Sequence, residues 1–330
     1  MTPPSVTVAI PVRNGGELFA GTLRALASQT VEHELLVCDS ESSDDSVERA
    51  RARGARVLDI SPASFSHGGT RNLLMREARG SHVALLTQDA EPADERWLER
   101  LLEGFSLGED VGLAFGPYVP RPQASFAVRV ELERFFASLA PGGEPVVERL
   151  TPQERGALPA RALLGGRGFF TDANACVARA AWERVPFRAA AYAEDRVLAL
   201  DMLRAGYAKA FVPGAAVIHS HDYRPSQELQ RCFDEWRGLL EVYGWREPAG
   251  PRGLVRRLRG EMAAVRAAAD AEGLAGGERR ATFVAAGRHH VLRLAGALLG
   301  SRADRLPAAA RRALSLERRA SFVPLDLESP

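Results

Sequence analysis

The chain has 330 residues and a formal net charge of +1, with 46% hydrophobic and 26% charged residues. This composition is typical of a globular protein with a large core, and it excludes a disordered chain. A net charge so close to zero also argues against duplex DNA as a partner of the whole chain.

Short apolar runs alternate with helical patterns along the first 115 residues. Strand-like runs lie at 6–12, 35–38, 55–60, 82–87 and 111–115, and segments with helical spacing lie between them. The alternation predicts an α/β fold, with a mostly parallel sheet flanked by helices. Ligands bind beyond the carboxyl ends of the strands in such sheets, so the residues that follow each strand are the first candidates for function.

Four loops at these predicted strand ends carry acids, amides or arginine. They span 11–16, 39–45, 65–72 and 87–92. Turn and helix-capping chemistry explains one such loop, but four loops at a shared edge indicate a binding site. The loops contain neither a dinucleotide fingerprint, nor a Walker loop, nor a Gly-x-Ser-x-Gly elbow.

The C-terminal part has a different composition. Residues 251–320 contain 15 arginines and six acidic residues, a net charge of +9, and they predict helices at 252–269, 279–299 and 304–316. An apolar stripe with neighbouring arginines is compatible with contact to anionic lipid, with packing on the rest of the chain, and with oligomerisation.

Two further observations concern the compartment. The three cysteines, Cys38, Cys176 and Cys232, are too few and too scattered for a disulfide framework or a zinc finger, and they fit a reducing cytoplasm. A strand-like segment follows the first five residues directly, so we expect no signal peptide, and no apolar run is long enough to span a membrane.

Several motifs resemble those of inverting family 2 glycosyltransferases, which have a GT-A fold. The matching segments are Val8-Ala-Ile-Pro-Val-Arg-Asn14, Val37-Cys-Asp-Ser-Glu-Ser-Ser-Asp-Asp45, Thr70-Arg-Asn72, Leu85-Leu-Thr-Gln-Asp89, Glu194-Asp195 and His219-Ser-His221. Within that family, the segments 65–72, 87–90 and 217–223 most resemble bacterial rhamnosyltransferases.

The resemblance implies a GT-A catalytic domain over 1–245, with a nucleotide-binding half at about 1–120 and an acceptor and sugar half at about 121–245. Residues 246–330 would form a basic helical region. The implied activity moves L-rhamnose from dTDP-L-rhamnose to a glycan or lipid-linked acceptor in cell-surface polysaccharide synthesis. The enzyme would be cytoplasmic, with peripheral contact to the inner face of the cell membrane as one option, and without a nucleic-acid partner.

Two alternatives to this activity remain at this point. One is the same fold with a UDP- or GDP-sugar donor. The other is a non-catalytic protein that binds sugar nucleotides.

The resemblance also implies a divalent cation, Mg²⁺ or Mn²⁺, that neutralises the diphosphate leaving group. Family members usually offer Asp-x-Asp after the fourth strand, whereas this chain has Thr87-Gln88-Asp89. Asp89 is therefore the expected carboxylate ligand, and His219 is expected as a further ligand. His221 is placed with the substrate residues, although the sequence does not separate the two histidines as metal ligands.

Six residues are implied at the nucleotide. Asp39 would read the edge of the pyrimidine base, with helix capping as its structural alternative. Arg71 would approach the base or the phosphates, because a guanidinium binds phosphate with two parallel hydrogen bonds. The full set is Pro11, Arg13, Asn14, Asp39, Arg71 and Gln88.

Inversion requires a carboxylate that takes the proton of the acceptor hydroxyl. The resemblance assigns this base to Asp195, with Glu194 orienting it or contacting the sugar. Stabilisation by the helix dipole is the structural alternative for both acids. Asp172, Asn174 and His67 are the remaining implied substrate contacts.

Overall fold

The computed structural model describes residues 6–163, 165–190 and 192–325. The chain divides into two compact units. The first comprises Met1–Arg121, Phe135–Ala190 and Glu194–His219, and the second comprises Pro122–Arg134, Ala191–Ala193 and Ser220–Pro330. The predicted functional boundary near residue 245 stays a prediction.

The first unit is built on an eight-stranded sheet within the described part of the chain, in the order β3-β2-β1-β4-β9-β6-β10-β8. The strands are β1 Val6–Val12, β2 Glu34–Asp39, β3 Arg56–Asp59, β4 His82–Leu86, β6 Val111–Phe115, β8 Val146–Glu148, β9 Asn174–Ala178 and β10 Ala208–Phe211. Parallel pairing joins β1 to β2 and β4, β2 to β3, and β6 to β10. The predicted α/β fold with a mostly parallel sheet is confirmed.

The apolar runs become strands because helices cover both faces of the sheet. Val8, Ala9 and Ile10 of β1 are all fully buried, which is why this strand is continuously apolar rather than alternating. The central strand β9 runs antiparallel to β4 and β6 and was not predicted.

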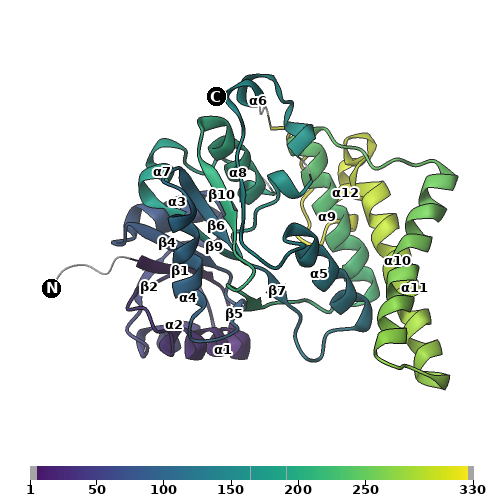
Figure 1. Cartoon of the computed structure of the whole chain (residues 1–330), viewed down its shortest axis with the longest axis horizontal. Coiled ribbons are helices and arrows are strands. Elements are labelled where there is room, and N and C mark those ends of the chain that lie inside the picture. The colour runs from purple at the N-terminus through teal and green to yellow at the C-terminus, as the bar shows by residue number, and fades with distance from the viewer. Residues whose placement is uncertain (1–5, 164, 191, 326–330) are drawn as a thin grey trace. The chain divides into compact units, whose positions relative to one another are not determined.

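Seven helices of the described chain lie wholly in the first unit (Figure 1). They include the helices predicted between the strands, and α8 begins at the paired acids. They are α1 Gly16–Ala27, α2 Ser46–Arg51, α3 His67–Glu77, α4 Trp97–Glu103, α6 Pro152–Ala157, α7 Arg179–Arg184 and α8 Glu194–Ala205.

A small second sheet in the same unit positions the candidate site. It contains β5 Glu91–Pro92, β11 Val217–Ile218 and β7 Tyr118–Val119, with β11 in the middle. β11 pairs with both neighbours, so His219, the next residue, is brought beside the loop that precedes β5 and beside Tyr118 of β7.

The second unit is helical. It contains α9 Pro225–Tyr243, α10 Pro251–Ala271, α11 Gly276–Gly300 and α12 Ala308–Leu314, together with residues 126–134 of α5 Phe126–Leu139. α9 and α11 approach closely, since a Cβ on Gly296 would lie 2.6 Å from the carbonyl oxygen of Leu229. The predicted C-terminal helices are confirmed, and no described helix is long and apolar enough to cross a membrane.

Candidate functional site

The loops after β1 and β2 are bound to each other. The Asn14 backbone N–H donates to Ser42 Oγ at 2.8 Å, and the Ser43 N–H donates to Asn14 Oδ1 at 2.7 Å. Asn14 and Glu41 have φ values of 50° and 54°, a left-handed conformation that residues other than glycine adopt rarely. Such strain persists only where the surroundings hold it, and it is concentrated at functional sites.

The predicted nucleotide residues belong to these loops. Asp39 ends β2 and is buried, and its two carboxylate oxygens accept hydrogen bonds from the Ser42 N–H at 3.0 Å and the Ser42 hydroxyl at 2.5 Å. The Gln88 side chain accepts a hydrogen bond from the Arg13 N–H at 2.8 Å. This bond connects the loop after β4 to the loop after β1. Arg13 is exposed and Pro11 half-buried. Contact of these residues with a nucleotide stays a prediction.

Arg71 and Asp172 form a buried ion pair. Arg71 Nε lies 2.8 Å from Asp172 Oδ2, and its two terminal nitrogens donate to the carbonyl oxygens of Leu86 and Asp172 at 3.1 and 3.2 Å. The guanidinium is thus fixed between the end of β4 and the segment before β9. The sequence placed the two residues separately, at the phosphates and at the sugar, and gave no sign of their pairing.

Asn174 is fully buried at the start of β9. Its Oδ1 accepts a hydrogen bond from the Trp97 indole N–H at 2.8 Å. Its Nδ2 donates hydrogen bonds to the carbonyl oxygens of Pro117 and Ala215 at 3.1 and 2.8 Å. Because the amide has three partners inside the protein, we assign Asn174 to the framework of the site and not, as the sequence analysis did, to substrate.

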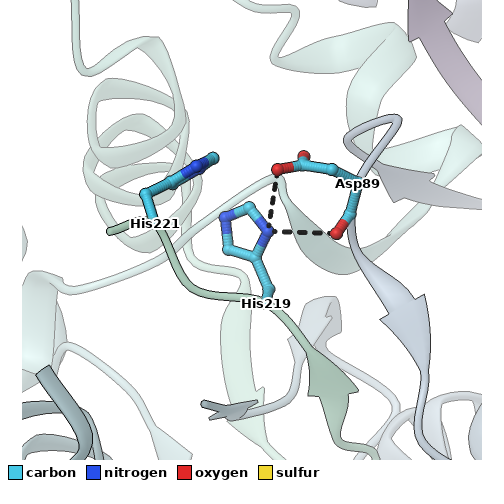
Figure 2. Close-up of side chains that lie close together, drawn as sticks. All are labelled: Asp89, His219 and His221. Carbon is cyan, nitrogen blue, oxygen red and sulfur yellow. Dashed lines mark hydrogen bonds and ion pairs between the residues drawn. The ribbon is translucent and has the colours of Figure 1, made fainter. Parts of the chain in front are cut away.

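Asp89 and His219 face each other (Figure 2). His219 Nδ1 lies 3.6 Å from Asp89 Oδ2 and 3.4 Å from the Asp89 carbonyl oxygen. Metal–ligand distances for Mg²⁺ are about 2.1 Å, so this separation lets both side chains bind one ion. His221, also drawn there, is exposed and lies two residues further along, in the second unit.

Thr87, which stands where the family usually has an aspartate, does not replace that carboxylate. Its hydroxyl is buried and has no hydrogen-bond partner within the described chain. Asp89 therefore remains the carboxylate that the end of β4 offers to a cation, and an oxygen and a nitrogen donor suit a divalent ion.

Tyr118 connects this pair with the acids on the other side of the site. Its ring meets His219 edge-on at 4.9 Å between centroids, and its hydroxyl is hydrogen-bonded to Thr171. Burial raises the pKa of Tyr118, and the negative charges of Asp195, Asp172 and Asp89 raise it further. All three carboxylates therefore lie within electrostatic range of the Tyr118 hydroxyl. Tyr118 was not predicted from the sequence, although it follows the end of the predicted strand at 111–115.

Glu194 and Asp195 open α8, directly after Ala193, whose φ is 59°. Burial and the charges of Asp172 and Asp195 raise the pKa of Glu194 well above its usual value. Burial, followed by the charge of Asp172, raises the pKa of Asp195 to about 7. A helix dipole lowers the pKa of an acid in the first turn, so burial and the neighbouring charges outweigh it here. The roles of Asp195 as the base and of Glu194 as its partner stay predictions.

These shifts suit proton transfer, because a general base works best with a pKa near the working pH. The Asp195 carboxylate accepts a hydrogen bond from the Arg196 N–H at 2.7 Å, which fixes the orientation of the carboxylate. The exposed His67 lies beside the pair, with Nδ1 3.8 Å from Glu194 Oε1. The first unit thus brings the acids, Arg71 and the Asp89–His219 pair to one site.

Comparisons with known proteins identify the family of the chain. The model of the family "Glycosyl transferase family 2" matches residues 7–148. The O-antigen chain rhamnosyltransferase RfbN of Salmonella typhimurium is 30% identical over 235 residues, 69% of this chain and 70% of the relative. WbaN of Salmonella anatum, also an O-antigen chain rhamnosyltransferase, is 31% identical over 241 residues, 70% and 71% of the two chains.

A similar solved structure is the mannosyltransferase PcManGT from Pyrobaculum calidifontis, in complex with GDP-Man and Mn²⁺. The TM-score is 0.58 at 16% identity, over 90% of this chain and 87% of that one. At this identity the likeness concerns the fold alone.

The raised pKa of Asp195 predicts that this carboxyl destabilises the native protein at neutral pH. Below about pH 4 it is protonated in both the folded and unfolded states. Between about pH 4 and pH 7 it ionises only on unfolding, so stability falls as the pH rises through that window. Asp195→Asn should therefore raise the unfolding free energy by about 1–3 kcal/mol at pH 8 and by almost nothing at pH 4.

Urea unfolding at the two pH values measures this difference. Asp59→Asn is the matched control, since Asp59 is an exposed carboxylate on β3. An Asp195→Asn variant that is less stable than the wild type at pH 8 would contradict the assignment.

Proposed function

Since the chain belongs to glycosyl transferase family 2 and is a glycosyltransferase with the GT-A fold, we propose that it transfers L-rhamnose from dTDP-L-rhamnose to a glycan or lipid-linked acceptor, with inversion. Two relatives near 30% identity are O-antigen chain rhamnosyltransferases, which supports the sugar and the setting in polysaccharide synthesis. The observation that carries the mechanism is the acid pair of α8, with its raised pKa values, in the same site as Asp89 and His219.

In the proposed reaction, Asp195 takes the proton of the acceptor hydroxyl as that oxygen attacks the anomeric carbon. The charge of Asp172, held in place by Arg71, keeps the pKa of Asp195 high enough for this role. Glu194, whose pKa is raised by burial and by the charges of Asp172 and Asp195, orients the sugar or the base in this proposal. His67, whose Nδ1 lies 3.8 Å from Glu194 Oε1, would contact the substrate beside Glu194.

Asp89 and His219 would hold the divalent cation that the family implies. Mg²⁺ or Mn²⁺ bound there neutralises the charge of the diphosphate leaving group. His221 is proposed as a further contact to the ion or the substrate, because it follows His219 by two residues. Pro11, Arg13, Asn14, Asp39 and Gln88 would line the nucleotide.

A non-catalytic role is less well supported. A protein that only binds sugar nucleotides has no use for a carboxylate poised near neutral pH, and burying Glu194 and Asp195 next to Asp172 lowers stability. A UDP- or GDP-sugar donor remains the alternative within the same activity, and it is decided by the donor comparison below.

The three buried cysteines form no disulfide, which supports the proposed cytoplasmic location.

Asp195→Asn should lower kcat by about 10²–10⁴-fold, the usual contribution of a general base, while the dissociation constant of the donor stays unchanged. Asp172→Asn should instead move the acidic limb of the kcat/KM profile, which we expect near pH 7 in the wild type, to lower pH. Rates and donor binding measured from pH 5 to 9 test both effects, with Asp59→Asn as the control. Unchanged turnover in Asp195→Asn would exclude Asp195 as the base.

Asp89→Ala should weaken donor binding and remove its dependence on Mg²⁺ or Mn²⁺, because the carboxylate ligand is lost. Binding of dTDP-L-rhamnose, UDP- and GDP-sugars is measured by calorimetry with and without each ion, and Glu95→Gln, an exposed nearby acid, is the control. Tighter binding of a UDP- or GDP-sugar than of dTDP-L-rhamnose would overturn the proposed donor. An unchanged ion response in Asp89→Ala would overturn the metal site.

We also propose that the second unit contacts anionic membrane lipid, which would bring the enzyme to a lipid-linked acceptor. Val255 of α10 and Val284 and Val291 of α11 are 48, 75 and 51% exposed, and exposed arginines such as Arg256 and Arg259 lie on the same pair of helices. Apolar side chains flanked by arginines suit a surface that lies on headgroups.

The full chain should therefore sediment with vesicles that contain phosphatidylglycerol and not with neutral ones. Each arginine near such a surface contributes about 1 kcal/mol, so Arg256→Glu/Arg259→Glu should lower the partition coefficient by about 30-fold or more. Arg51→Glu/Arg76→Glu, two exposed arginines of the first unit, is the matched control. The proposal would be contradicted if both double variants lost vesicle binding equally, or if the wild type did not bind the vesicles.

A further inference from the structure

A second cluster of metal-ligating side chains lies within the helical unit. Glu131 of α5 and His289 and His290 of α11 each place one ligand atom within 4.8 Å of the others. All three residues belong to the second unit, and none takes part in the proposed sugar transfer.

His289 lies between two carboxylates. Its Nε2 is 3.0 Å from Glu131 Oε2, and its Nδ1 contacts Glu228 Oε1 of α9. A histidine that binds a metal through one nitrogen usually donates its other N–H to a carboxylate, which fixes the tautomer and the orientation of the ring. Glu228 is in the position of that outer partner, and Nε2 faces Glu131.

Glu131 is held in place from its other side. Arg293 Nη2 lies 2.9 Å from Glu131 Oε1, which leaves Oε2 directed at His289. The start of α5 is further fixed by Ala127, which packs with Val265 and Ala286. The candidate ligands therefore come from rigid helices.

His290 supplies the second, independent observation. The residue is only 7% exposed, and its Nε2 is buried without a hydrogen-bond partner among the described residues. Buried polar atoms are nearly always satisfied, so an unpartnered ring nitrogen beside a histidine and a carboxylate points to a missing ligand.

His290 and Glu131 also line a cavity of about 50 Å³, whose other charged lining residues are Glu261, Arg257 and Arg293. A water molecule needs roughly 10–15 Å³ of such volume, so there is room for an ion and for water as a further ligand.

We propose that Glu131, His289 and His290 bind a divalent transition-metal ion of the Zn²⁺ type, separate from the catalytic cation, with Glu228 orienting His289. Two imidazoles and one carboxylate favour Zn²⁺ over Mg²⁺, which prefers oxygen ligands. The ion takes the place of the proton between His289 and Glu131 and ties α5 to α11, with α9 as the outer support.

The test uses Zn²⁺ and Co²⁺ alone and the full chain without an affinity tag. Asp89→Asn serves as the background, so that ions at the catalytic site do not contribute. This variant should bind one Zn²⁺ per chain in equilibrium dialysis, show a Co²⁺ d–d absorption spectrum, and unfold at a higher temperature with Zn²⁺ than without.

Asp89→Asn/His290→Gln should weaken Zn²⁺ binding by more than about 100-fold, since loss of an outer partner alone costs about 10–100-fold. Because His290 Nε2 has no partner, this substitution removes no hydrogen bond from that atom, and far-UV circular dichroism checks the fold. Asp89→Asn/Glu228→Gln should weaken binding by about 10–100-fold while the Co²⁺ spectrum is retained.

Asp89→Asn/His33→Gln is the matched control, because His33 lies in the first unit. The proposal is overturned if Asp89→Asn binds no Zn²⁺, or if the His290→Gln and His33→Gln double variants bind it equally. Both outcomes are independent of sugar transfer, so they leave the proposed function to its own tests.

Discussion

The buried ion pair of Arg71 and Asp172 is the constraint on which the candidate site depends. It joins α3 to the segment before β9, and a buried charge that lost its partner would cost about 3–5 kcal/mol. Burial is the largest cause of the raised pKa values of Glu194 and Asp195, and the charge of Asp172, which Arg71 holds in place, raises both further. One interaction therefore contributes to the fold and to the electrostatics of the acid pair.

The small sheet is the second feature that shapes the candidate site, because it brings distant segments of the chain close to Asp172. Pairing of β11 with β5 and β7 places His219 beside Asp89 and Tyr118. Tyr118 then lies among the charges of Asp89, Asp172 and Asp195. The Asp89–His219 pair, which we propose to hold a cation, and the acid pair of α8 thus belong to the same polar site.

Charged residues are arranged differently in the two units. In the first unit the acids are concentrated where the donor and acceptor are proposed to bind, and the pKa shifts follow from their mutual repulsion and burial. In the second unit arginines such as Arg256 and Arg259 are exposed on the helices, whereas His289 and His290 are buried beside Glu131 and Glu228. The inner cluster is compatible with a structural ion, and the outer surface with lipid.

The sequence by itself determined the parallel strands, the helices between them and the family, because these depend on local periodicity and on short motifs. It also singled out Asp89, Asp195 and His219 as candidates, because each of them follows a strand or lies in the first turn of a helix. It could not determine the antiparallel β9, the framework role of Asn174, or the ion pair between Arg71 and Asp172, which are 101 residues apart. Those features depend on burial and on contacts between distant segments, which exist only after the chain has folded.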